Sequence, residues 1–214
     1  MMWMKNIEPR LLNSSIEYGE IVASHIIEWS KNDNYDYTRT LFRYKLSDTL
    51  GAWLPTPPEY NDGMEPNWPL IRQVMLPKGS FFEFITHDFY NEKESSACFK
   101  HMNAVYQKAL TLKQEEKDIA VYWDDNPATT ISKGHAMFVE KKPSPEGHWL
   151  KMTGQAINDK ALSMEEAATV YAAVSVTAFD AFINCWNAKY SLNTIRPETY
   201  IQRNMDPDFK PAIE

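Results

Sequence analysis

A lysine and an arginine stand seven positions apart near the end of the sequence, Lys189 and Arg196, and Pro197 directly follows the arginine. Two cations that converge on one point repel each other unless an anion lies between them. The planar fork of arginine and the compact ammonium of lysine together suit a small tetrahedral oxyanion, for which phosphate is the natural candidate. From the residue types alone, a pair of solvated surface charges is the commoner explanation. The pair therefore predicts an anion site only if the fold brings both side chains together.

The strongest predicted helix of the sequence leads to this pair. Ser163, with Glu166 three residues later, has the pattern of a capping box that opens a helix. The apolar stripe that follows has helical spacing and is predicted to be buried; it consists of Val170, Tyr171, Val174, Ala178, Phe182, Cys185 and Trp186. Lys189 continues this face, so we expect it at or just past the end of the helix.

The residues between the two cations predict a corner. Ser191, Asn193 and Thr194 favour a turn. Pro197 disfavours helix at Arg196 and suits the first position of a new helix. In a straight helix the two cations would be roughly 10 Å apart along the axis. A helix–turn–helix corner would bring them closer.

The rest of the chain predicts an all-α fold. Apolar periodicity indicates helices over about residues 15–31, 91–112 and 145–158, and Thr111 with Gln114 suggests a capping box for another helix that ends near Trp123. Proline is concentrated in a long loop over about residues 47–80, which we expect to be packed by its own aromatic side chains. Strand signals are weak and local, at residues 71–76 and 136–139.

Length and composition indicate a single globular domain. The chain has 214 residues, of which 43% are hydrophobic and 24% charged, and nothing marks a boundary within residues 1–214. The net charge of -7 argues against a nucleic-acid partner. We find no signal-peptide core and no apolar run of transmembrane length, so we expect a soluble chain as given, exported or periplasmic if a leader has been removed. The two cysteines, Cys98 and Cys185, set no disulfide framework, and we expect both to be buried.

The spacing of Lys189, Arg196 and Pro197 resembles KX6RP, the first signature of the type 2 phosphatidic acid phosphatase superfamily, which includes the vanadium-dependent haloperoxidases. The segments FDAFINCWNAK, IAVYWDDNP and EGHW are similar to the haloperoxidase branch, and the resemblance covers about residues 15–205. It implies a helical bundle of the haloperoxidase and phosphatase type. It also implies that Lys189 and Arg196 bind phosphate, or vanadate as the haloperoxidase cofactor, with a small phosphorylated substrate in the phosphatase case.

The resemblance also implies two further signatures, PSGH and SRX5H, whose histidines carry the acid/base and nucleophilic chemistry. We expect these histidines beyond Glu214, and therefore no catalytic residue within this chain. The run PSPEGH at residues 143–148 is not a substitute, because it precedes Lys189 and separates Ser144 from Gly147 by two residues. We interpret His148 as structural.

Two functions follow from this interpretation. The first is an enzyme, hydrolysing phosphomonoesters or, second in preference, oxidising halide with vanadate, in which this chain supplies the scaffold and part of the anion site and is inactive alone. The alternative is a non-catalytic helical module that binds an anion or a protein. In either case we expect exposed apolar surface to be covered by a missing carboxy-terminal half or by a second copy of the chain.

For the other polar residues considered, a structural role is expected more than a functional one. Asp180, on the long helix among apolar neighbours, is expected to form a buried hydrogen bond or ion pair that sets helix packing and at most orients Lys189 and Arg196. Asp124 and Asp125, with Asp88, resemble paired carboxylates, but capping and solvation explain them better. The histidines are dispersed, so no metal site is expected; they are His25, His87, His101, His135 and His148.

Overall fold

The structure is a computed structural model that describes residues 7–57, 60–77, 90–126, 130–133, 136–139 and 142–212, with backbone only for the two strands. Its elements in chain order are α1 Pro9–Ser30, α2 Tyr35–Thr38, the 3₁₀ helix η1 Trp68–Leu70, α3 Ala97–Leu110, α4 Gln114–Tyr122, β1 Thr130–Lys133, β2 Ala136–Val139, α5 Pro145–Asp159, α6 Met164–Leu192 and α7 Pro197–Asn204. The two short strands form one antiparallel hairpin. The all-α prediction is confirmed.

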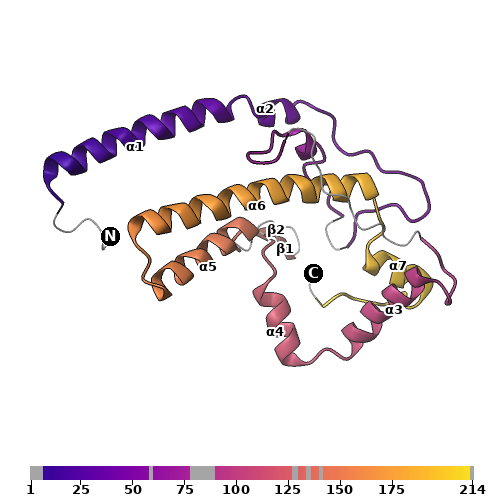
Figure 1. Cartoon of the computed structure of the whole chain (residues 1–214). Helices are drawn as coiled ribbons and strands as arrows, with labels where there is room; N and C mark the ends of the chain where they lie inside the picture. Colours follow the sequence, from indigo (N-terminus) through magenta and orange to yellow (C-terminus); the bar gives the residue numbers. More distant parts are fainter. Residues whose placement is uncertain are drawn as a thin grey trace.

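Helix α6 is the central element of the described chain (Figure 1). Its predicted capping box is present, because Ser163 Oγ accepts from the Glu166 amide at 3.3 Å and the Ser163 amide donates to Glu166 at 2.8 Å. Helix α5 packs along the first half of α6, where a Cβ on Gly154 would lie 2.8 Å from the Tyr171 hydroxyl. The second half of α6 is covered by η1 and the irregular chain around it. The helix therefore links α5 to the carboxyl-terminal part of the fold.

Helices α3 and α7 build a second, smaller core. Tyr200 and Ile201 of α7 are completely buried, and Tyr200 packs with Cys98 of α3. The Tyr200 hydroxyl donates to the Asn91 carbonyl at 2.7 Å, so the fully buried phenol has a partner. This packing fixes the start of α7 relative to the end of α6.

Helix α1 contributes no buried residue. Its predicted apolar stripe exists but is exposed, with Tyr18 at 69% and Ile26 at 60%. Its carboxyl end is held by Arg72, whose guanidinium lies 3.7 Å from the centroid of the Trp29 ring and donates to the Trp29 carbonyl at 2.7 Å. The helix begins at Pro9 rather than near residue 15, since Glu8 accepts from the Arg10 amide and Pro9 suits the first helical position.

Several local predictions were wrong. Helix α4 is opened by Lys113, whose amide donates to Glu116 at 3.0 Å, and not by Thr111. Residues 71–76 form no strand. Cys98 is buried as expected, but Cys185 is exposed. The buried residues of α6 are Ala167, Asp180, Ile183 and Asn184. The predicted stripe is only half-buried, with Tyr171 and Cys185 exposed, although Trp68 packs against Phe182 and Trp186.

Among the described residues, α6 is long and apolar enough to cross a membrane when judged by length and composition. Core helices of soluble proteins pass the same test, and α6 buries Asp180 and Asn184 inside the fold. The absence of a transmembrane segment stays a prediction.

Candidate functional site

Residues 189–197 form the predicted corner. Lys189 lies in the last turn of α6, and Asn193 ends the helix in the left-handed conformation, with φ of 45° and its amide donating to the Lys189 carbonyl at 3.1 Å. Asparagine tolerates this conformation better than most residues, which explains its position here. Arg196 immediately precedes α7, whose first residue is Pro197. The helix–turn–helix prediction is confirmed.

The surroundings of Lys189 disfavour its positive charge. Partial burial lowers the pKa of Lys189 from its ordinary value, and the charge of Arg196 lowers it further. The Lys189 ammonium lies 4.7 Å from the centroid of the Trp186 ring, in a cation–π contact. Within the described residues, neither Lys189 nor Arg196 forms a salt bridge with a carboxylate. Burial raises the pKa of Glu198 and the charge of Arg196 opposes that shift, so a carboxylate lies in the surroundings of Arg196 without forming a salt bridge with it. An anion bound at the corner would be attracted by both cations.

The predicted long loop builds the backbone of the corner. The Ile195 amide donates to the Gly51 carbonyl at 2.8 Å, and the Trp53 amide donates to the Asn193 carbonyl at 3.1 Å. The Tyr44 hydroxyl donates to the Asn193 side chain at 2.6 Å. Gly51 has a φ of 86°, and a Cβ there would lie 2.4 Å from Tyr90, so glycine is required. A segment distant in sequence thus fixes the turn between the two cations.

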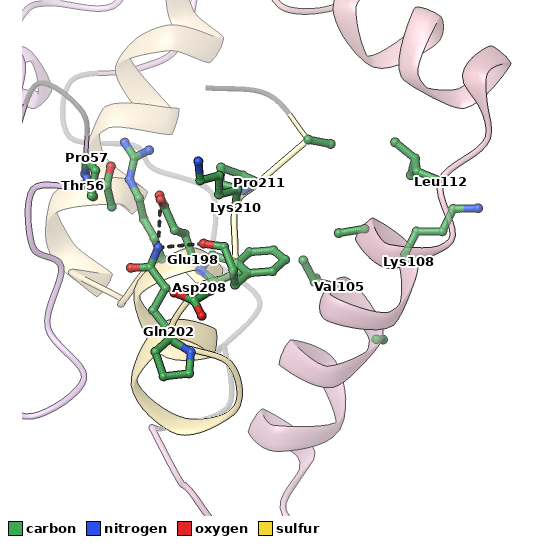
Figure 2. Close-up of a pocket in the computed structure, with 17 residues that line it drawn as sticks. Thr56, Pro57, Val105, Lys108, Leu112, Glu198, Gln202, Asp208, Lys210 and Pro211 are labelled. Atoms are coloured by element: carbon green, nitrogen blue, oxygen red, sulfur yellow. Dashed lines mark hydrogen bonds between the residues drawn. The ribbon is translucent and has the colours of Figure 1, made fainter.

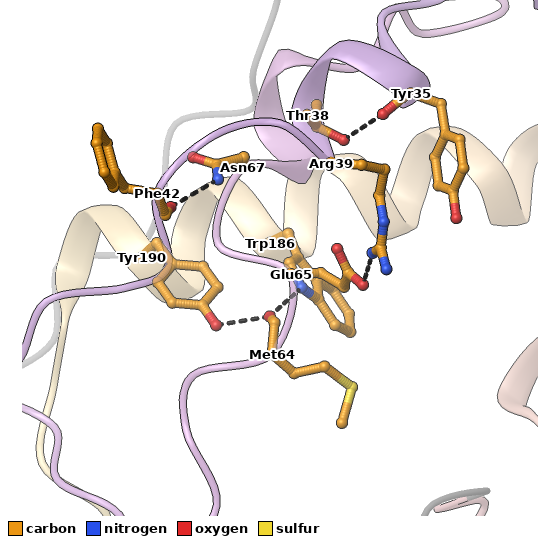
Figure 3. A network of polar contacts seen from close by, with 9 residues as sticks. All are labelled: Tyr35, Thr38, Arg39, Phe42, Met64, Glu65, Asn67, Trp186 and Tyr190. Carbon is orange, nitrogen blue, oxygen red and sulfur yellow. Dashed lines mark hydrogen bonds and ion pairs between the residues drawn. The ribbon is translucent and has the colours of Figure 1, made fainter.

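A second part of the loop, residues 60–67, holds the last turns of α6. The Met64 carbonyl accepts a hydrogen bond from Trp186 Nε1 at 3.0 Å and another from the Tyr190 hydroxyl at 2.6 Å. Figure 3 shows both rings directed at this one carbonyl, with Glu65 beside it in an ion pair with Arg39. These loop residues had no signal in the sequence. In this part of the site, only Trp186 belongs to the segment FDAFINCWNAK that was identified in the sequence.

Asp180 fastens the next part of the loop to α6. Asp180 is 5% exposed. Its carboxylate accepts hydrogen bonds from three consecutive backbone amides: Val74 at 2.6 Å, Met75 at 2.9 Å and Leu76 at 3.1 Å. The predicted buried hydrogen bond is therefore present. Within the described residues it has no cationic partner, and its influence on Lys189 and Arg196 stays a prediction.

A large open cavity of about 1150 Å³ adjoins the corner on the side of Arg196. Figure 2 shows Glu198 and Lys210 on one wall and Lys108 of α3 on the other. Gln202 donates to the Phe209 carbonyl at 2.9 Å and so holds the chain end in place. Burial raises the pKa of Glu198, while the charge of Arg196 opposes that shift. Arg196 lines this cavity and Lys189 does not.

The PSPEGH run has a local structural role. Ser144 caps α5 by accepting from the Gly147 amide at 3.2 Å. His148 is 5% exposed, bonds Asp125 at 2.8 Å and stacks on Trp123 at 5.1 Å between ring centroids. These contacts agree with the rejection of this run as the second signature.

The prediction that Asp124 and Asp125 serve capping and solvation was wrong. Asp125 binds His148, and Asp124 forms a largely buried salt bridge with Lys142. Asp88, His87 and His135 lie outside the described residues. Among the residues that are described, no cluster of three potential ligands could hold a metal ion, so the expected lack of a metal site stays a prediction.

No protein-family model matches this chain, and no curated protein matches it. Among solved structures, it is similar to the crystal structure of a bacterial vanadium-dependent iodoperoxidase, with a TM-score of 0.85 and 36% sequence identity. The match covers 96% of this chain and 49% of the iodoperoxidase, so the chain spans about half the length of that protein. The two share the all-α haloperoxidase fold over this length.

Proposed function

We propose that this chain belongs to the superfamily of vanadium-dependent haloperoxidases and type 2 phosphatidic acid phosphatases, and that Lys189 and Arg196 bind its tetrahedral oxyanion. The observation that carries the proposal is the corner at residues 189–197, which places Lys189 in the last turn of α6 and Arg196 directly before α7, with neither in a salt bridge among the described residues. The similarity to the iodoperoxidase supports it. The anion would be phosphate from a small phosphorylated substrate or vanadate as a cofactor.

The two cations would neutralise charge on the anion. Such preorganised charges contribute most where negative charge develops on the transferring group, and the partial burial of Lys189 strengthens its field. Neither side chain supplies a nucleophile for phosphoryl transfer, which needs a histidine to attack and an acid to protonate the leaving oxygen. Vanadate, if it is the natural anion, would supply the halide-oxidising chemistry. The similarity to the iodoperoxidase supports the halide-oxidising activity, and phosphomonoester hydrolysis is the alternative for the same anion site.

We propose that a second helical segment, carrying the PSGH and SRX5H signatures, covers the exposed apolar faces of α1 and α6. Large apolar side chains are exposed on both helices, among them Leu11, Ile16 and Ile27 of α1 and Tyr171 and Phe179 of α6. An exposed apolar surface of this kind suits burial against further protein. The cavity beside Arg196 would admit the segment that brings the histidines.

A titration with phosphate and orthovanadate tests the anion site. The ¹⁵N-labelled chain should show saturable shifts of the amides of residues 189–196, and Lys189→Met combined with Arg196→Met should abolish them. A matched series with sodium chloride controls for ionic strength. An absence of saturable binding by the wild-type chain would overturn the proposal.

Two further measurements test the completing segment. The coding DNA past Glu214, or a neighbouring reading frame, should encode PSGH and SRX5H. Phosphate release by the purified chain alone should stay at background. If neither signature is encoded and light scattering shows a stable dimer, the non-catalytic helical module with a second copy as its partner replaces the enzyme hypothesis.

A further inference from the structure

Trp186 connects the irregular loop to the ammonium of Lys189. Its ring stacks on Phe182 at 5.2 Å and packs against Trp68 at 4.8 Å between centroids. Its N–H is bound by the Met64 carbonyl at 3.0 Å. Packing on both neighbours together with a directional hydrogen bond leaves the indole one orientation. The Lys189 ammonium then lies over the ring of Trp186.

The Met64 carbonyl is itself held from two sides. Trp186 and Tyr190 are one turn apart on the same face of α6, so one acceptor can reach both donors. The loop approaches closely here, because a Cβ on Gly63 would lie 3.0 Å from the Tyr190 hydroxyl. The ion pair between Arg39 and Glu65 anchors the next residue of the loop. These contacts together fix the position of the Met64 carbonyl.

The ammonium needs such support. Desolvation and the charge of Arg196 both disfavour the positive charge of Lys189, so without another contact the ammonium would move further into solvent. A cation–π contact opposes this motion with about 0.5–2 kcal/mol. The contact works only if the ring is held in the orientation that faces the ammonium.

We propose that the Met64 carbonyl, acting through Trp186, is the positioning group that holds the Lys189 ammonium over the indole ring at the corner before an anion arrives. This inference rests on the proposed anion site and adds a specific role for the loop. Preorganisation of this kind increases affinity because the cost of ordering the lysine is met during folding and not during binding. Met64 and Trp186 are positioning residues and need not touch the anion.

Tyr190→Phe is the decisive variant. It removes one of the two hydrogen bonds to the Met64 carbonyl and keeps the aromatic ring that packs on Tyr44 at 5.2 Å. The Lys189 Cε protons should show an upfield ring-current shift in the wild-type chain, and this shift should shrink in the variant without any anion present. Phosphate binding should weaken about 2–5-fold, in line with the loss of one hydrogen bond.

Two further variants provide a larger change at the same contact and a control. Trp186→Leu should remove the ring-current shift and weaken phosphate binding by up to about tenfold. Tyr171→Phe changes a tyrosine on the same helix, far from the corner and against Gly154, and should leave the shift and the affinity unchanged. Urea unfolding of each variant shows whether the fold is retained.

The outcomes separate the two proposals. If the wild-type chain binds phosphate but Tyr190→Phe and Trp186→Leu bind it equally well, the positioning role is wrong and the anion site stands. If the wild-type chain binds no phosphate, the anion site is wrong, and the inference that depends on it falls as well. A wild-type Lys189 without a ring-current shift would overturn the positioning role independently of any ligand.

Discussion

The Tyr44 hydroxyl donates a 2.6 Å hydrogen bond to the side-chain oxygen of Asn193, across 149 positions of sequence. Asn193 is the left-handed residue that turns the chain between Lys189 and Arg196. A side chain from the segment just before the long loop thus holds the residue that turns the chain between the two cations.

Substitutions of Tyr44 and Asn193 should lower the free energy of unfolding by different amounts. Tyr44→Phe should cost about 0.5–1.5 kcal/mol of unfolding free energy through the lost hydrogen bond. Asn193→Gly should cost a similar amount, because glycine adopts positive φ without strain, while Asn193→Ala should cost about 1 kcal/mol more. Urea unfolding measures all three. Equal stability of the alanine and glycine variants would contradict the importance of the left-handed turn.

Asp180 should be among the most sensitive positions in the chain. Asp180→Asn places an amide N–H₂ where the carboxylate oxygens accept from Val74, Met75 and Leu76, so at least one buried amide loses its partner. We expect a loss of about 3 kcal/mol in unfolding free energy.

Limited trypsin digestion gives an independent measurement of the same variant, because release of residues 74–76 should accelerate cleavage after Arg72. Glu165→Gln, in the exposed first turn of α6, is the control and should change stability by only a few tenths of a kcal/mol. Unchanged cleavage at Arg72 would show that Asp180 does not hold the loop.

The sequence predicted the helices more accurately than the contacts between them. The capping pattern of Ser163 and Glu166 and the proline at 197 are local signals, and α6 and α7 begin where these signals indicate. Residues 44, 51 and 64 reach the corner through backbone carbonyls and a single phenol, and such long-range hydrogen bonds leave no periodic pattern. The wrong assignment of Asp124 and Asp125 has the same origin, since their partners Lys142 and His148 follow an intervening hairpin.

Binding of a non-titrating anion should weaken at high pH. The folded-state pKa of Lys189 is lowered by burial first and by Arg196 second, so its positive charge is lost below its ordinary value of 10.5. Sulfate keeps its charge over this range, so its affinity should be constant near neutral pH and fall as the pH approaches 10.5 from below. Lys189→Arg should remove this fall because the guanidinium stays protonated. A wild-type affinity that is level up to pH 10.5 would contradict the shift.

The alkaline stability of the fold should depend on two buried phenols. Burial is the first cause that raises the pKa of Tyr190 and the pKa of Tyr200, each from 10.0 to about 12. A group whose pKa is raised by folding stabilises the native state fully below its unfolded pKa, and this contribution is lost as the pH rises through the folded value. Unfolding free energy should therefore fall between pH 10 and about 12.

Urea unfolding across this range, in the wild type and in Tyr190→Phe and Tyr200→Phe, isolates the phenols from the lysines that titrate nearby. Each variant should start from a lower stability at neutral pH, because it lacks a hydrogen bond to Met64 or to Asn91, and should then lose stability less steeply than the wild type above pH 10. Tyr18→Phe, on the exposed face of α1, should follow the wild-type slope. If the wild type and both buried variants lost stability in parallel, the phenols would ionise as readily in the folded chain as in the unfolded one. That result would contradict the contacts of Tyr190 with Met64 and of Tyr200 with Cys98.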